Sequence, residues 1–125
     1  MVIHENFRDF VLFLYLHMAH ADGSMHQQEE SVVREKMKKL FAEDDHLEEH
    51  FGRLLRQYRD CPQDQVQAII RDSFDHFSSV TFAEKYRVYT DMYDIINADG
   101  RVDQSEKTTL DQLREIINLG IEPKP

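Results

Sequence analysis

Hydrophobic residues recur every three or four positions along nearly the whole chain, which is the spacing of one face of an α-helix. No stretch alternates polar and apolar residues as a strand does, so we expect an all-α fold. The first helix, from about Phe7 to His20, is apolar nearly all round and should be enclosed by the others. Five more amphipathic segments follow, at about 27–40, 45–58, 62–77, 82–96 and 104–119.

Capping residues mark the expected helix ends. Asn6 precedes the first helix, Pro62 suits the first turn of the fourth, and Gly120 is placed to end the last one in the left-handed conformation. Capping boxes, in which a polar residue is followed three positions later by Glu, are predicted to begin the third, fifth and last helices, at Asp45–Glu48, Thr81–Glu84 and Asp103–Glu106. Short connections predict antiparallel neighbours in one compact bundle of about six helices.

Size and charge limit the domain organisation and the partners. At 125 residues the chain has the size of one domain, so we expect residues 1–125 to form a single helical unit with a flexible tail at about 121–125. The net charge of −9 argues against nucleic acid, because neutralising phosphates needs clustered Lys and Arg. The only basic cluster is short: Arg34, Lys36, Lys38 and Lys39. An acidic surface favours a cation or a basic protein partner, besides keeping the chain soluble.

A cytoplasmic location is expected. Cys61 is the single cysteine, so no internal disulfide can form, which fits a reducing compartment. Residues 10–19 are strongly apolar and the Ala-His-Ala string ending at Ala21 imitates a signal-peptidase site, but Glu5 and Asp9 stand where a positive flank is needed. The run is also too short to cross a bilayer, so no membrane insertion is expected.

An acidic Asp-Gly turn occurs twice. The string from Ala21 to Glu29 matches the string from Ala98 to Glu106: each has Ala-Asp-Gly, an apolar residue two places after the Gly, and a Glu in the first turn of the next helix. Each copy joins an apolar helix to an amphipathic one. The fold is therefore predicted to contain two pseudo-repeated helix–turn–helix units.

With these turns near its start and its end, the chain resembles the TerB family, a helical domain associated with tellurite resistance and related to the N-terminal part of a membrane-anchored DnaJ-type co-chaperone. The resemblance covers the length, the helical content and both turns. It implies a bundle whose acidic turn residues lie close together and bind a divalent cation such as Ca²⁺, Mg²⁺ or Zn²⁺. His26 stands at the place of Asp103, which makes the first copy less acidic. Carried over by position, the implied ligands are Asp22, His26, Glu29, Asp99, Asp103 and Glu106.

The turns have two physical explanations. An Asp at a helix C-terminus faces the negative end of the helix dipole, an unfavourable contact of about 0.3–1 kcal/mol that a bound cation would relieve. Alternatively, the Asp accepts hydrogen bonds within the turn, the Gly takes the left-handed conformation, and Glu106 completes a helix cap without any metal. The second copy also imitates an EF-hand loop, but the first ligand position holds Ile95, and the first copy has Met18 there.

The histidines raise one catalytic alternative. His46, Glu49 and His50 have the spacing of an inverted zinc-protease motif, and a metal-dependent hydrolase would use all three. A solvated helix face is the simpler interpretation, because a chain of this size leaves little room for a third ligand and a substrate cleft. His17, on the first helix, is expected to be a core histidine with its hydrogen bonds satisfied.

The expected function is that of a non-enzymatic accessory module in a stress or tellurite-resistance type system, a role implied by the resemblance alone. Such a module binds a protein partner and takes up a cation at the acidic turns. A purely structural interaction domain without metal is the close alternative, and the oligomeric state is left open, self-association included. The aromatic stripe of the fifth helix, formed by Tyr86, Tyr89 and Tyr93 together with Phe82, is expected to face the core.

Overall fold

The residues that the structure describes form six α-helices and contain no strand. The structure is a computed structural model that describes residues 2–21, 23, 25–77, 79–98, 100 and 104–119, with side chains only to Glu115 in the last helix. The helices are α1 (Phe7–Ala19), α2 (Gln27–Leu40), α3 (Leu47–Asp60), α4 (Gln63–His76), α5 (Phe82–Ile96) and α6 (Gln104–Leu119). The all-α prediction is confirmed.

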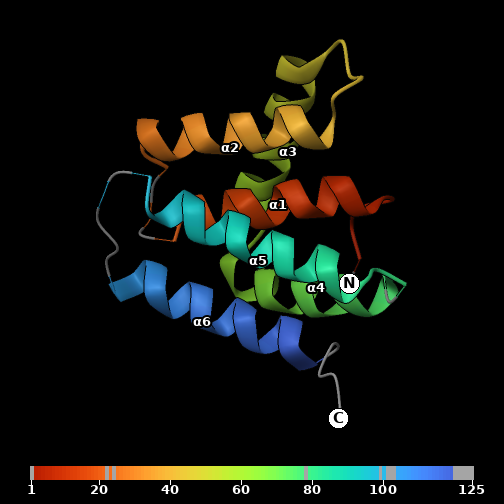
Figure 1. Cartoon of the computed structure of the whole chain (residues 1–125), viewed down its shortest axis with the longest axis vertical. Coiled ribbons are helices and arrows are strands. Elements are labelled where there is room, and N and C mark those ends of the chain that lie inside the picture. The colour runs from red at the N-terminus through yellow and green to blue at the C-terminus, as the bar shows by residue number, and fades with distance from the viewer. Residues whose placement is uncertain are drawn as a thin grey trace.

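The central element of the bundle is α1. It contacts α2, α3, α5 and α6. Figure 1 shows α1 between α2 and α5, with α6 on the far side of α5 and α3 running across the direction of α2. Because other helices surround it on all sides, α1 has almost no face left for solvent.

This central position explains the apolar composition of α1. Every residue from Phe10 to Leu16 is at most 1 % exposed, as the sequence pattern predicts for an enclosed helix. Burying a large apolar side chain contributes about 1.5–3 kcal/mol, so α1 supplies much of the driving force for folding. The other helices pack one stripe each around it, with buried residues that include Val33, Met37, Phe51, Leu54, Val66, Ile69, Ile70, Met92, Ile95, Leu110 and Leu113.

Two predicted helix caps are confirmed. The Asn6 side chain accepts the backbone N–H of Asp9 at 2.9 Å and begins α1. The Thr81 hydroxyl accepts the backbone N–H of Glu84 at 3.2 Å and begins α5. Each bond satisfies one of the N–H groups that a helix start leaves without an intrahelical partner.

The start of α3 differs from the prediction. No capping box forms at Asp45; the N-cap residue is His46, and the Asp44 carboxylate accepts the His46 N–H at 2.7 Å. The helix therefore begins at Leu47, and the acceptor just before it is the carboxylate of Asp44 rather than that of Asp45. The predicted cap at Asp103 and the predicted left-handed Gly120 lie outside the described residues.

The aromatic stripe of α5 does not face the core, contrary to the expectation from its spacing. Phe82 is 49 % exposed, Tyr86 57 % and Tyr93 53 %, while Tyr89 is half-buried against the core. The side of α5 that packs inward carries instead Lys85, Val88, Met92, Ile95 and Ile96. Both sides have helical periodicity, so spacing alone does not tell which of them the neighbouring helices cover.

A polar network joins three helices inside the bundle. The Tyr15 hydroxyl on α1 donates to Asp91 Oδ2 on α5 at 2.7 Å, and Lys36 on α2 lies 2.9 Å from Asp91 Oδ1 and 2.8 Å from Asp94 Oδ2. Burial and the adjacent Asp91 carboxylate raise the pKa of Tyr15 above its usual value. Lys36 thus points inward, and the short basic cluster predicted on α2 is in part a set of internal ion pairs.

Candidate functional site

The described residues of the two Asp-Gly turns share two backbone features. Gly23 has φ +103° and Gly100 has φ +80°, so both take the left-handed conformation that favours glycine. The N–H of Gly23 donates to the carbonyl of His20 at 2.9 Å, and the N–H of Gly100 donates to the carbonyl of Asn97 at 3.0 Å. At the two glycines, the repeat predicted from the sequence thus has the same local backbone conformation.

The helix ends before the turns are also equivalent. The His20 side chain bonds through Nδ1 to the carbonyl of Leu16 at 2.7 Å, and the Asn97 amide donates to the carbonyl of Tyr93 at 2.9 Å. In both copies a polar side chain folds back onto the carbonyl four residues earlier, which also accepts the backbone N–H of the same residue, at 3.0 Å from His20 and 3.2 Å from Asn97. A His and an Asn, which share no charge or shape, thus perform the same local task.

Each turn is followed by a buried glutamate. Glu29 is 0 % exposed and Glu106 is 3 % exposed, which is unusual for a charged residue. Glu29 Oε1 accepts the backbone N–H of His26 at 3.0 Å, half of a capping box at the start of α2. Glu29 thus caps the start of α2. The metal-free explanation of the turns assigns the same role to Glu106, its counterpart in the second copy.

The structure brings the two turns to one end of the molecule. Figure 1 shows α1 and α5 running in the same direction, so the described residues of both turns lie at the left-hand end of the view. Antiparallel neighbours at each turn, α1 with α2 and α5 with α6, return the chain from that end. The acidic turns implied by the resemblance are therefore on the same side of the bundle.

The described part of the predicted metal site is incomplete. Asp22, Asp99 and Asp103 lie outside the described residues, and His26 is exposed at the N-cap of α2. Within the described part of the chain, no group of three or more His, Cys, Asp or Glu side chains is arranged to hold a metal ion. Of the predicted ligands that the structure describes, Glu29 and Glu106 have carboxylate oxygens, the donors that Ca²⁺ and Mg²⁺ prefer.

An EF-hand is excluded by the positions that should start the loops. Met18 and Ile95 stand at the first ligand position of the two copies, and both are 0 % exposed in the core. A calcium loop requires an oxygen ligand there and a helix that has already ended. Here α1 and α5 continue past that position, to Ala19 and Ile96.

Comparison with known proteins decides the family. The family model described as tellurite resistance protein TerB matches residues 8–123, nearly the whole chain. The chain belongs to the TerB family. The resemblance that the two Asp-Gly turns indicate is thereby confirmed. Searches of curated proteins and of solved structures give no match.

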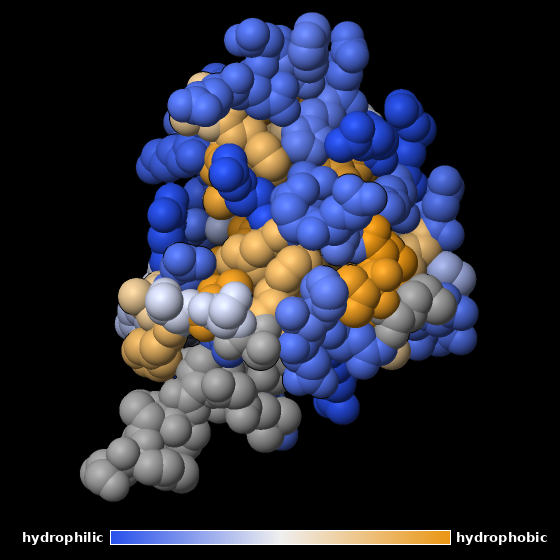
Figure 2. All heavy atoms as spheres, turned by 90° about the vertical axis from the view of Figure 1, so that its right-hand side faces the viewer, coloured by the Kyte–Doolittle hydropathy of each residue, from blue (hydrophilic) through white to orange (hydrophobic). Residues whose placement is uncertain are grey.

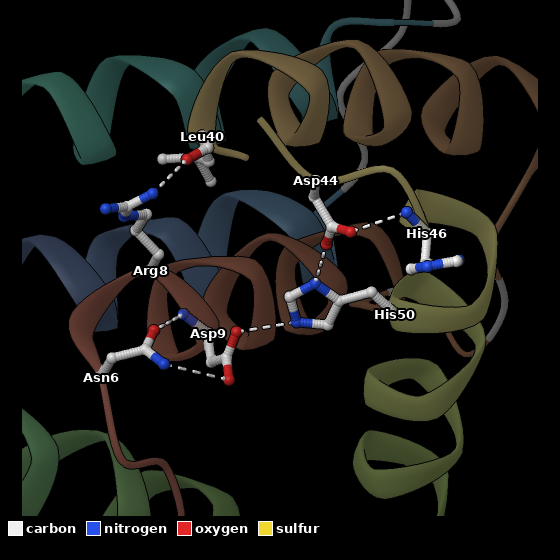
Figure 3. Close-up of polar contacts among 7 residues, drawn as sticks. All are labelled: Asn6, Arg8, Asp9, Leu40, Asp44, His46 and His50. Atoms are coloured by element: carbon white, nitrogen blue, oxygen red, sulfur yellow. Dashed lines mark hydrogen bonds and ion pairs between the residues drawn. The ribbon is translucent and has the colours of Figure 1, made fainter. Parts of the chain in front are cut away.

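In this TerB-family chain, one histidine of the motif formed by His46, Glu49 and His50 has a structural role. His50 lies between two carboxylates, with Nδ1 2.9 Å from Asp44 Oδ2 and Nε2 2.9 Å from Asp9 Oδ1 (Figure 3). Bonds from His46 N–H and from His50 hold the pKa of Asp44 below its usual value. The bridge ties the first turn of α1 to the α2–α3 connection and to α3.

Nearby contacts strengthen the same junction. Arg8 on α1 donates to the carbonyl of Leu40 at the end of α2, at 3.2 Å (Figure 3). Sequence reasoning missed this junction because Asp9 and His50 are 41 residues apart, and neither residue carries a local signal for the other. Only the packing of α1 beside α3 brings them together.

The bridge occupies both ring nitrogens of His50. Each nitrogen lies 2.9 Å from a carboxylate oxygen, so neither is turned toward a metal shared with His46. His46 and Glu49 are exposed and border an open hollow of about 690 Å³ on α3, where Arg53 and Arg56 also lie. The hydrolase alternative therefore lacks one of its two histidine ligands.

Alanine at position 50 distinguishes the two roles. We expect His50→Ala to lower the free energy of unfolding by about 1–3 kcal/mol, because Asp9 and Asp44 lose their shared partner. The matched variant His46→Ala should change it by less than about 0.5 kcal/mol, since that side chain is exposed. Chemical denaturation of the three proteins measures both effects, and equal losses would contradict the bridge.

No helix within the described residues is long and apolar enough to cross a membrane.

Proposed function

We propose that this TerB-family chain is a non-catalytic accessory module of a tellurite-resistance type system, located in the cytoplasm, that takes up a divalent cation at its two acidic turns and binds a protein partner. The observation that carries the cation proposal is the pair of equivalent turns, each with a left-handed glycine and a buried glutamate one helical turn into the next helix. The two matched acidic junctions lie at the same end of the bundle (Figure 1), an arrangement that would let them share one cation.

Electrostatics supports this assignment. Burying a carboxylate is costly unless an opposite charge or several hydrogen bonds compensate it. Asp22 and Asp99 add further carboxylates at helix C-termini, where the dipole is also negative. A cation would add an opposite charge beside these carboxylates, besides the hydrogen bond that Glu29 already accepts from His26, and carboxylate oxygens favour Ca²⁺ or Mg²⁺ over Zn²⁺. On this proposal Glu29 and Glu106 hold the cation together with the turn aspartates.

Calorimetric titration of the metal-stripped protein with Ca²⁺, Mg²⁺ and Zn²⁺ tests the proposal. We expect one of the hard cations to bind to the wild-type protein, and binding to disappear in the Asp22→Asn, Asp99→Asn double variant. A double variant with the same change in charge, Asp64→Asn with Asp75→Asn on exposed positions of α4, should bind as the wild type does.

Two results would overturn the cation proposal. If none of the three proteins binds a cation, the repeated turn only ends one helix and starts the next. Asp99→Asn should then lower the free energy of unfolding and have no other effect. If both double variants bind equally, the cation lies elsewhere, and zinc retained through His46 would revive the hydrolase alternative. Thermal melts recorded with and without cation exclude a variant that has simply unfolded.

A further inference from the structure

Four aromatic residues of α5, of which Phe82, Tyr86 and Tyr93 are exposed and Tyr89 is half-buried, form a second seam on that helix. Phe82, Tyr86, Tyr89 and Tyr93 follow one another at intervals of four, three and four residues, the spacing of a coiled-coil contact line. Phe82 and Tyr86 already stack on each other, with centroids 6.2 Å apart and an interplanar angle of 26°. Large exposed aromatic residues in a line are typical of protein–protein contacts rather than of solvated surface.

The order of these intervals makes the seam self-complementary. Reading four, three, four from either end gives the same sequence of steps, so the pattern is palindromic. Two copies of α5 laid antiparallel about a two-fold axis therefore match in register, with Phe82 over Tyr93 and Tyr86 over Tyr89. A two-fold contact uses the same patch on both copies, and this patch meets that condition.

Charge limits where two copies could meet. With a net charge of −9, two copies repel each other over most of their surface. Beside the seam, Ala83, Thr90 and Asn97 carry no charge, and Lys85 and Met92 on the other side are buried. The exposed charges next to this open flank are Arg87 and Asp94, which have opposite signs, so the seam itself does not set a row of like charges against its copy.

The surface around the start of α5 is consistent with an apolar contact. Figure 2 views the right-hand side of Figure 1, onto which the first turn of α5 and the N-terminal segment face. Hydrophobic residues reach the surface in a band across the middle of this face, and hydrophilic residues cover the part above it. The seam begins at this face and follows α5 away from it.

We propose that the α5 seam is a homodimer interface, in which two copies of this chain pair antiparallel through Phe82, Tyr86, Tyr89 and Tyr93. An aromatic side chain covers about 150–250 Å² when buried, so three that are half-exposed offer about 200–400 Å² per copy. A standard stable interface needs about 800 Å² per partner. The dimer is therefore weak, with a dissociation constant of about 10 µM to 1 mM.

Sedimentation at protein concentrations from about 10 µM to 1 mM tests the pairing. The apparent mass of the wild type should rise toward twice the monomer value. Tyr86→Glu, at a side chain that is 57 % exposed, should weaken association at least about tenfold without unfolding the chain. Gln65→Glu adds the same charge at an exposed position of α4 and should associate as the wild type does. A wild type that stays monomeric, or a Tyr86→Glu variant that associates equally, overturns the proposal.

A spin label tests the antiparallel direction. In a Cys61→Ser background, a nitroxide on Ala83→Cys of one copy should broaden the amide signals near Met92 of an unlabelled, isotope-enriched copy. Broadening near residue 83 instead indicates parallel pairing, and broadening away from α5 places the contact elsewhere; either result overturns the antiparallel seam. A wild type that remains monomeric but captures an amphipathic helix of another protein assigns the seam to that partner and also overturns self-pairing.

Discussion

Replacing Phe10 by alanine is expected to lower the free energy of unfolding by about 3–5 kcal/mol, the range for removing a fully buried phenylalanine. Phe10 is 0 % exposed on α1, with its ring 5.1 Å from Phe74 in an edge contact and 5.9 Å from Phe77 in a stacked one. The substitution leaves a cavity and removes the link between α1 and α4. Because whole domains are stable by only about 5–15 kcal/mol, this variant should be close to unfolding at moderate temperature.

The matched control is Phe82→Ala on α5. It removes the same side chain from a position that is 49 % exposed, so we expect a loss below about 1 kcal/mol. Urea denaturation of both variants, with the slope of the transition compared to that of the wild type, measures the difference. Similar losses in the two variants would contradict the difference in burial between these two phenylalanines. They would also mean that the α5 seam contributes to the stability of the monomer.

Stability should fall in mild acid because of His17. This residue lies on α1, with Nδ1 3.0 Å from the hydroxyl of Tyr58. Burial, and then the proximity of His20, lower the pKa of His17 from 6.5 to about 4. His4, buried against Phe13, has its pKa lowered by burial too and acts in the same direction. The expectation of a core histidine on the first helix agrees with this environment.

The sign of the effect follows from proton binding. Between about pH 6.5 and pH 4 the unfolded chain protonates His17 while the folded chain keeps it neutral. The unfolded state then binds more protons, so the free energy of unfolding declines as the pH falls through this window and levels off below it. For a shift of this size the decline attributable to His17 amounts to at most ~3 kcal/mol.

Comparison with His17→Gln isolates this contribution. Glutamine can keep a hydrogen bond to Tyr58 but does not titrate, so the variant should lose less stability than the wild type between pH 7 and pH 4.5. Denaturant midpoints measured across this range give the two curves. Parallel curves would show that groups other than His17, among them His4 with its lowered pKa, cause the acid sensitivity.

The candidate site could be anticipated only in part. The Asp-Gly turns were recognisable because glycine is the residue that accepts a positive φ at low cost, and Gly23 and Gly100 both use it. The burial of Glu29 and Glu106 had a weaker signal, since a Glu in the first turn of a helix is normally an exposed capping residue. The His50 bridge had no signal, because its two carboxylates come from separate segments.

By itself, the sequence determined the helices, the caps at Asn6 and Thr81, and the enclosed position of α1, because these depend on residues within a turn or two of one another. The tertiary structure alone decided which side of α5 packs inward, since the stripes of Tyr86 and of Met92 both have helical spacing. It also decided that His50 is a bridge between carboxylates rather than a metal ligand. Both outcomes depend on which helices lie side by side, and that is settled by the packing of the whole chain around α1.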